Sequence, residues 1–95
     1  GDISAAKARS EVVRREVWAK ESKGTKAVRK LVVWKTNKEV DNPSMPAYVV
    51  HWTDYSPSRA NPLDREVKLA PTSEIADRIA NQFVSENIKK GWEPA

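Results

Sequence analysis

The sequence predicts an α+β domain in which a mainly antiparallel, four-stranded sheet packs against one long C-terminal helix. Three observations lead to this fold class. Apolar residues recur at helical spacing near the C-terminus, shorter runs before them alternate as strands do, and polar turn sequences separate those runs. The length of 95 residues suits one domain. We therefore expect residues 11–95 to form a single α+β domain, after a flexible or short helical start over residues 1–10.

The C-terminal helix has the clearest signals. The segment Pro71 to Glu74 is a start sequence, because Thr72 or Ser73 can cap the first turn and an acidic residue suits its positive end. Gly91, preceded by two lysines, is expected to end the helix. The apolar stripe between these signals consists of Ile75, Ala76, Ile79, Ala80, Phe83, Val84 and Ile88.

Four strands are expected before this helix. Residues Glu11 to Lys20 should pair with Ala27 to Thr36, because Ser22 to Thr25 has the composition of a turn between two β-branched runs. A third strand begins at Tyr48, where apolar residues alternate with polar ones, and a fourth lies just before the helix. Two irregular loops, Asn37–Ser44 and Asp54–Asp64, connect the later strands. This order places the helix on one face of the sheet.

The basic residues are concentrated in the first part of the chain. Residues 1–38 hold eleven lysines and arginines and four acidic residues, a net charge of +7, whereas residues 39–95 hold six basic and nine acidic residues, a net charge of −3. Together they give the overall charge of +4. This asymmetry indicates a positive face that could meet phosphate groups or an acidic protein. The alternative is an ordinary, well-solvated charged surface.

The composition argues against a catalytic or metal centre. Cysteine is absent and His51 is the only histidine, so a metal site would lack the usual partner ligands. His51 lies within a strand pattern, and we interpret it as a strand residue on the less buried face. Glycine occurs only at positions 1, 24 and 91, which excludes a glycine-rich phosphate loop. We expect a protein that is not an enzyme and that binds no cofactor.

No apolar run approaches the roughly 18 residues that a membrane span requires, and the sequence has no signal-peptide pattern. The absence of cysteine is compatible with a reducing compartment. We expect a cytoplasmic protein with no membrane partner.

Basic residues interleaved with aromatic ones give the best indication of function. Lysine and arginine on a sheet can hold phosphates, and an exposed Trp34 or Trp52 could stack on a base, although tryptophan in a small domain more often belongs to the core. Six candidate residues lie on the first hairpin and its exit, and two flank the proline-rich loop: Lys23, Lys26, Arg29, Lys30, Lys35, Lys38, Arg59 and Arg65. For the last two, pairing with Asp54 and Asp64 within the loop is the alternative.

The segment from Tyr48 to Trp92 resembles the WGR domain, a nucleic-acid-binding module that occurs beside catalytic domains such as poly-ADP-ribose polymerases and in bacterial DNA-metabolism proteins. The shared pattern is a strand that begins at Tyr48, the tryptophan Trp52, a further strand, and an apolar helix that ends near Lys-Lys-Gly-Trp. The family's Trp-Gly-Arg motif is replaced by Trp-Thr-Asp at residues 52–54. The resemblance implies nucleic-acid binding without catalysis.

Two functions follow as expectations. The first is a noncatalytic nucleic-acid-binding or accessory domain that uses its basic hairpin to contact phosphates, with DNA favoured over RNA. The second is a protein-interaction or assembly module of unknown partner, for which an acidic protein is a candidate. Its contact surface would be the hairpin edge or the loop from Asp54 to Asp64.

Overall fold

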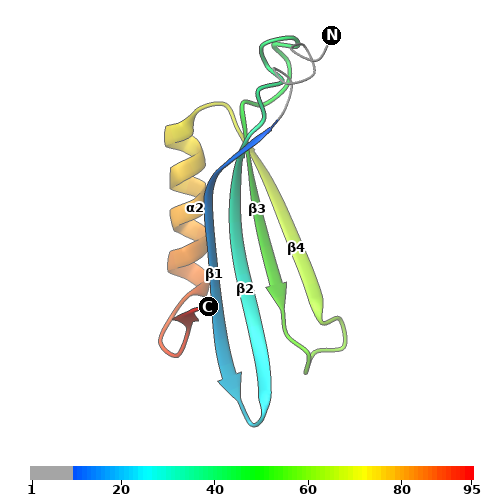
Figure 1. The fold of residues 1–95 in the computed structure, drawn as a ribbon, viewed down its shortest axis with the longest axis vertical. Coiled ribbons are helices and arrows are strands. Elements are labelled where there is room, and N and C mark those ends of the chain that lie inside the picture. Colours follow the sequence, from blue (N-terminus) through cyan, green and yellow to red (C-terminus); the bar gives the residue numbers. More distant parts are fainter. Residues whose placement is uncertain (1–9) are drawn as a thin grey trace.

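A computed structural model of the chain describes residues 10–95 (Figure 1). The predicted flexible or helical start over residues 1–10 therefore lies outside the described residues, except for Ser10. The elements are the strands β1 (Glu11–Ser22), β2 (Thr25–Lys35), β3 (Tyr48–Tyr55), β4 (Leu63–Ala70) and β5 (Glu93–Pro94), and the helix α2 (Ser73–Asn87). The strands form one sheet in the order β4-β3-β2-β1-β5, and every neighbouring pair is antiparallel.

The predicted fold class is confirmed, with one addition to the sheet. Four main strands pack against the C-terminal helix, and the two-residue strand β5 adds a fifth at the β1 edge. The predicted pairing of the first two strands is also confirmed, and the hairpin extends to the pair Ser22–Thr25. Its two turn residues have positive φ angles, 53° at Lys23 and 80° at Gly24. This conformation matches the right-handed twist of the paired strands.

Helix α2 covers one face of the sheet, and the core lies between the two layers (Figure 1). Trp52 on β3 is central to this core: its ring stacks on Phe83 of the helix at 5.3 Å between centroids, and the ring of Trp18 on β1 is tilted against it at a centroid distance of 6.0 Å. Such aromatic pairs add to the stabilisation from apolar burial. The buried core residues are Trp18, Leu31, Val33, Val50, Trp52, Ala70, Ala76, Ala80 and Phe83.

The helix begins as predicted, but it ends earlier. The side chain of Thr72 accepts a hydrogen bond from the backbone N–H of Ile75 at 3.2 Å, which caps the first turn. At the other end the helix stops at Asn87, so Lys89 and Lys90 lie beyond its last turn. Gly91, with φ of 102°, shapes the turn that leads into β5 instead of ending the helix. The chain leaves the helix at Ile88, where the carbonyl of the preceding Asn87 accepts a hydrogen bond from Arg29, and it then returns to pair with β1 as β5.

Replacing Gly91 with alanine is expected to lower the free energy of unfolding by about 1 kcal/mol, since an L-residue is strained at this φ angle. A Cβ atom here would also lie 3.0 Å from Cε of Lys20, whose flexible end can move aside. Urea denaturation of the variant would measure the loss. Gly24→Asn is a suitable comparison, because asparagine tolerates positive φ and no atom lies within 4 Å of a Cβ at residue 24. An unchanged midpoint for Gly91→Ala would contradict the expected strain.

Within residues 10–95, no helix has the length and apolar character needed to cross a membrane.

Candidate functional site

The face of the sheet opposite α2 is not covered by any element of the described chain, and we call it the open face (Figure 1). Successive side chains of a strand point to opposite faces. Leu31, Val33, Val50 and Trp52 point into the core, so the residues between them point to the open face. Because register partners on neighbouring strands share a face, the pairings of the four main strands identify the other residues of the open face.

The open face is organised in rows that run across the strands. One central row consists of Val17, Lys30, Thr53 and Arg65, which are successive register partners from β1 to β4. The neighbouring row contains Arg15, Val32, His51 and Val67. Adjacent rows are about 6.7 Å apart, because two residues separate them along each strand. Polar and apolar side chains are therefore mixed over this surface.

Three cations gather in these two central rows: Arg15 on β1, Lys30 on β2 and Arg65 on β4. None of them makes a hydrogen bond or an ion pair with another residue of the 10–95 segment. The carboxylates that the registers place on this face, Glu21 and Glu93, lie toward the hairpin end and the β5 edge. We refer to Arg15, Lys30 and Arg65 as the central cations.

Aromatic side chains flank the central cations along the sheet. On one side, Trp34 and His51 line a shallow hollow of about 280 Å³, together with Ser10, Thr36 and Val49. On the other side, Tyr55 lies one row beyond Lys30 and is 42% exposed. Trp34 and His51 are half-buried, so part of each ring is accessible. Of the two tryptophans considered from the sequence, Trp34 faces the open side, whereas Trp52 is a core residue.

The structure does not bring all the predicted cations together. Lys30 and Arg65 share one row of the open face, and Lys26 lies on the same face near the hairpin tip, opposite Glu21. Lys23 occupies the tip itself. Lys35 has the same orientation as Leu31 and Val33, toward the helix side.

Lys38 lies in the loop between β2 and β3, at the opposite end of the sheet from the hairpin tip (Figure 1). The buried Thr36 anchors this loop by donating a hydrogen bond to the carbonyl of Pro46 at 2.7 Å.

Arg29 lies on the helix side and contacts other residues of the fold. One guanidinium nitrogen donates to the backbone carbonyl of Asn87 at the end of α2, and another lies 3.4 Å from Oδ2 of Asp54. The guanidinium carbon lies 4.4 Å from the ring centroid of Trp92, a cation–π contact. Arg29 thus joins β2, β3, the end of the helix and the C-terminal segment. Its donors are directed into the molecule and away from the open face.

Arg59 forms the loop pairing that the sequence offered as an alternative to phosphate contact. Its Nη1 lies 3.1 Å from Oδ2 of Asp54, and its other nitrogens donate to the carbonyls of Asp54, Asn61 and Pro62. These bonds hold the loop between β3 and β4 in a closed turn. Arg65 points the other way and forms no such pair with Asp64 within residues 10–95.

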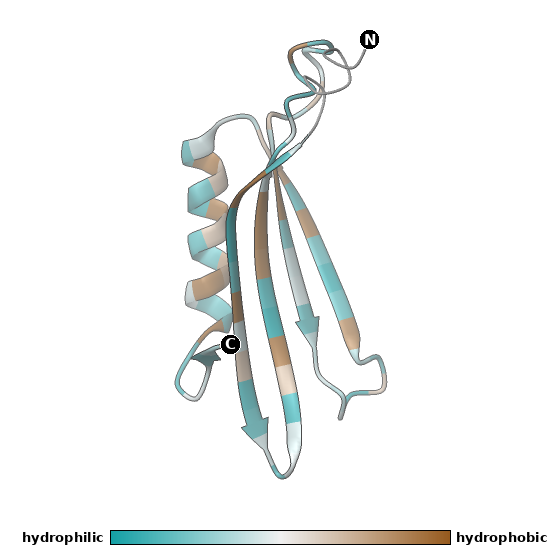
Figure 2. Cartoon of the chain, in the orientation of Figure 1, coloured by the Kyte–Doolittle hydropathy of each residue, from teal (hydrophilic) through white to brown (hydrophobic). Residues whose placement is uncertain are grey.

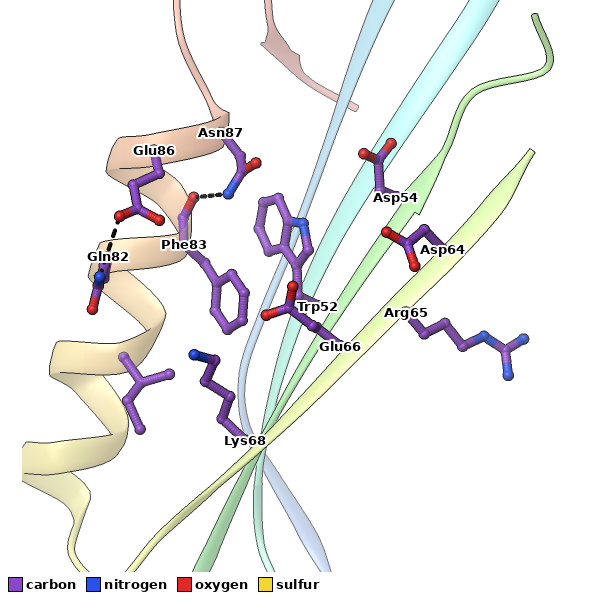
Figure 3. A pocket seen from close by; sticks show the side chains of 11 residues that line it. Trp52, Asp54, Asp64, Arg65, Glu66, Lys68, Gln82, Phe83, Glu86 and Asn87 are labelled. Atoms are coloured by element: carbon purple, nitrogen blue, oxygen red, sulfur yellow. Dashed lines mark hydrogen bonds between the residues drawn. The ribbon is translucent and has the colours of Figure 1, made fainter. Parts of the chain in front are cut away.

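A groove of about 250 Å³ runs between α2 and β4 on the helix side (Figure 3). Its carboxylates come from Asp54, Asp64, Glu66 and Glu86, and Lys68 points toward Phe83 at 5.8 Å from the ring centroid. Figure 3 also shows Arg65 pointing away from this groove. The acidic lining makes the groove a poor match for phosphate. Among the described residues, no cluster of three or more histidine or acidic side chains could hold a metal ion.

Sequence reasoning missed Arg15, and a β-bulge explains why. Val12 lies opposite Trp34 while Arg14 lies opposite Val33, so Val13 is an extra residue in β1. The bulge reverses the alternation, which hides the period of two in this part of the sequence. Counting back from the buried Trp18 would have placed Arg15 on the open face.

Comparisons of this chain with protein-family models, with curated proteins and with solved structures give no match.

Proposed function

We propose that this domain binds single-stranded nucleic acid, without catalysis, through the open face of its sheet. The observation that carries the proposal is the position of the central cations between two aromatic positions on a face that α2 leaves uncovered. Arginine and lysine side chains can neutralise phosphates, and aromatic rings can stack on unpaired bases. DNA is the first candidate, because the resemblance to the WGR domain points to DNA-metabolism proteins.

The form of the surface favours a single strand over a duplex. A duplex is usually read by a helix or a two-stranded ribbon that enters a groove, whereas the open face is a broad sheet. Unpaired bases can lie flat against Trp34 and Tyr55, which lie in the rows on either side of the two central rows. A strand that crosses these rows would meet a ring, then two rows with cations, then a second ring. Binding of this kind tolerates many sequences.

Titration of the ¹⁵N-labelled protein with a single-stranded oligonucleotide, followed by NMR, tests this proposal. Shift changes are expected around Arg15, Lys30, Arg65 and Trp34, and they should be small along the outer surface of α2. If three phosphates are neutralised, affinity should fall roughly 20-fold between 50 and 200 mM salt. Duplex DNA and RNA of the same sequence serve as comparisons. Changes confined to the helix, or no binding at 50 mM salt, would overturn the proposal.

A further inference from the structure

The two edge regions of the sheet differ in how their backbone groups are paired. At the β1 edge, β5 pairs with Trp18 and Ala19, the backbone N–H of Ala95 donates to the carbonyl of Val17 at 2.9 Å, and the bulge at Val13 interrupts regular pairing. At the other edge, β4 has eight residues, no proline and a register without irregularity, and no further strand of residues 10–95 pairs with it. A regular edge with unpaired backbone groups is a template for another strand.

The side chains of β4 suit a partner with defined properties. On the open face, Leu63, Val67 and Leu69 are 48%, 53% and 61% exposed. On the helix side, the strand carries Asp64 and Glu66, followed by Lys68. The apolar bands of β4 alternate with hydrophilic positions in Figure 2. The partner strand should therefore offer apolar contacts on one face and the same charges in reverse order on the other.

We propose that this partner is β4 of a second copy of the chain, paired in antiparallel fashion about a two-fold axis at Val67. In this register Glu66 lies opposite the partner's Lys68, and Lys68 lies opposite the partner's Glu66. On the open face, Val67 meets its own equivalent, and Leu69 lies against the aliphatic stem of the partner's Arg65. Opposite charges directly across a strand pair are stabilising.

The charges select this register over its neighbours. In an antiparallel pair, residues directly opposite each other point to the same face of the sheet. The two-fold axis between the two copies must therefore lie at a residue, and each alternative register places it at another residue of β4. An axis at Glu66 would place this carboxylate against its own equivalent, and an axis at Arg65 or Lys68 would do the same with two cations. Like charges directly opposite one another are destabilising. Among the central residues of β4, only the axis at Val67 avoids such a contact.

The dimer would be a continuous ten-stranded sheet, since each copy contributes five strands. A two-fold axis perpendicular to the sheet places both helices on one side and both open faces on the other. The inference rests on the β4 edge alone and does not depend on nucleic-acid binding. A contact of this size should be weak, with a dissociation constant in the micromolar range.

Analytical ultracentrifugation of the full chain without nucleic acid, from about 5 to 500 μM, tests the dimer. The unmodified chain is expected to dimerise over this range. Glu66→Lys alone and Lys68→Glu alone should each weaken dimerisation about tenfold or more, because each creates two like-charge contacts. The double variant Glu66→Lys/Lys68→Glu should restore it. Both residues are exposed, so the fold should tolerate these changes, and circular dichroism would verify that it does.

Mixing the two single variants gives the most specific result. One chain then carries two cations at the paired positions and the other carries two carboxylates. A heterodimer is therefore expected at concentrations at which each variant alone is mostly monomeric. Glu21→Lys on the hairpin is a control with the same charge change and no expected effect. A monomer throughout the concentration range would overturn the inference. So would a dimer that is insensitive to these substitutions, or one in which the mixed chains fail to associate.

Discussion

The double substitution Lys30→Glu and Arg65→Glu is expected to weaken binding of single-stranded DNA roughly 70-fold at 50 mM salt, and the new repulsion should weaken it further. The estimate comes from the counterions that two phosphate contacts release. Both side chains lie in one row of the open face, separated by Thr53, and neither is paired within residues 10–95. The fold should therefore be unaffected. Fluorescence anisotropy with a labelled oligonucleotide would measure the loss.

A matched control separates a local contact from the effect of net charge. Lys89→Glu combined with Lys90→Glu changes the charge by the same amount at exposed positions that follow α2. Affinity in this variant should change only a few-fold. The logarithmic salt dependence should also become shallower by about 1.4 in the Lys30/Arg65 variant. Equal losses in both variants would argue that binding is not localised on the open face.

Replacing Arg29 with alanine is expected to lower the free energy of unfolding by about 2–3 kcal/mol. The substitution removes the contacts to Asn87, Asp54 and Trp92 together. It also leaves the carboxylate of Asp54, whose side chain is only 14% exposed, with Arg59 as its remaining cation. Such a loss is a large part of the stability of a small domain. Urea denaturation followed by tryptophan fluorescence would measure it.

Arg15→Ala provides the comparison, since it removes the same side chain from an exposed position on the open face. Its effect on stability should stay within about 0.5 kcal/mol. For nucleic-acid binding, Arg15→Ala should reduce the affinity more than Arg29→Ala does, because Arg15 is one of the central cations. If the two variants had the same free energy of unfolding, the contacts of Arg29 would not contribute to the stability of the fold.

Local signals in the sequence were sufficient for the fold class. The apolar stripe from Ile75 and the cap at Thr72 define the helix, and the composition around Gly24 defines the first hairpin. The end of the helix was predicted wrongly, since the contacts around it come from residues far away in the sequence: Arg29 of β2 donates to the carbonyl of Asn87, and the segment that follows pairs with β1. A glycine after two lysines is a normal helix terminator, and nothing local distinguishes it from a glycine in a later turn.

The candidate site was harder to predict, because the face that a cation occupies depends on strand register. Lys30 and Arg29 are adjacent in sequence, yet one faces the open side and the other reaches Asp54 and Trp92. A count of charges does not distinguish these two residues. Only knowledge of which side of the sheet faces the core shows that they lie on opposite faces. The unpaired state of Arg65 could not be read from the sequence either, since Arg59 and Arg65 are equally placed to pair within the loop.

The pairing of Trp18 with Pro94 has a consequence for how the protein acquires its structure. The outer edge of β1 stays unpaired until β5 has been synthesised, because residues 93 and 94 follow the other described strands and the helix in the sequence. Contacts between remote parts of a chain slow folding, because the intervening loop must close first. We therefore expect the hairpin of β1 and β2 to form early and the docking of β5 onto β1 to be a late step of folding.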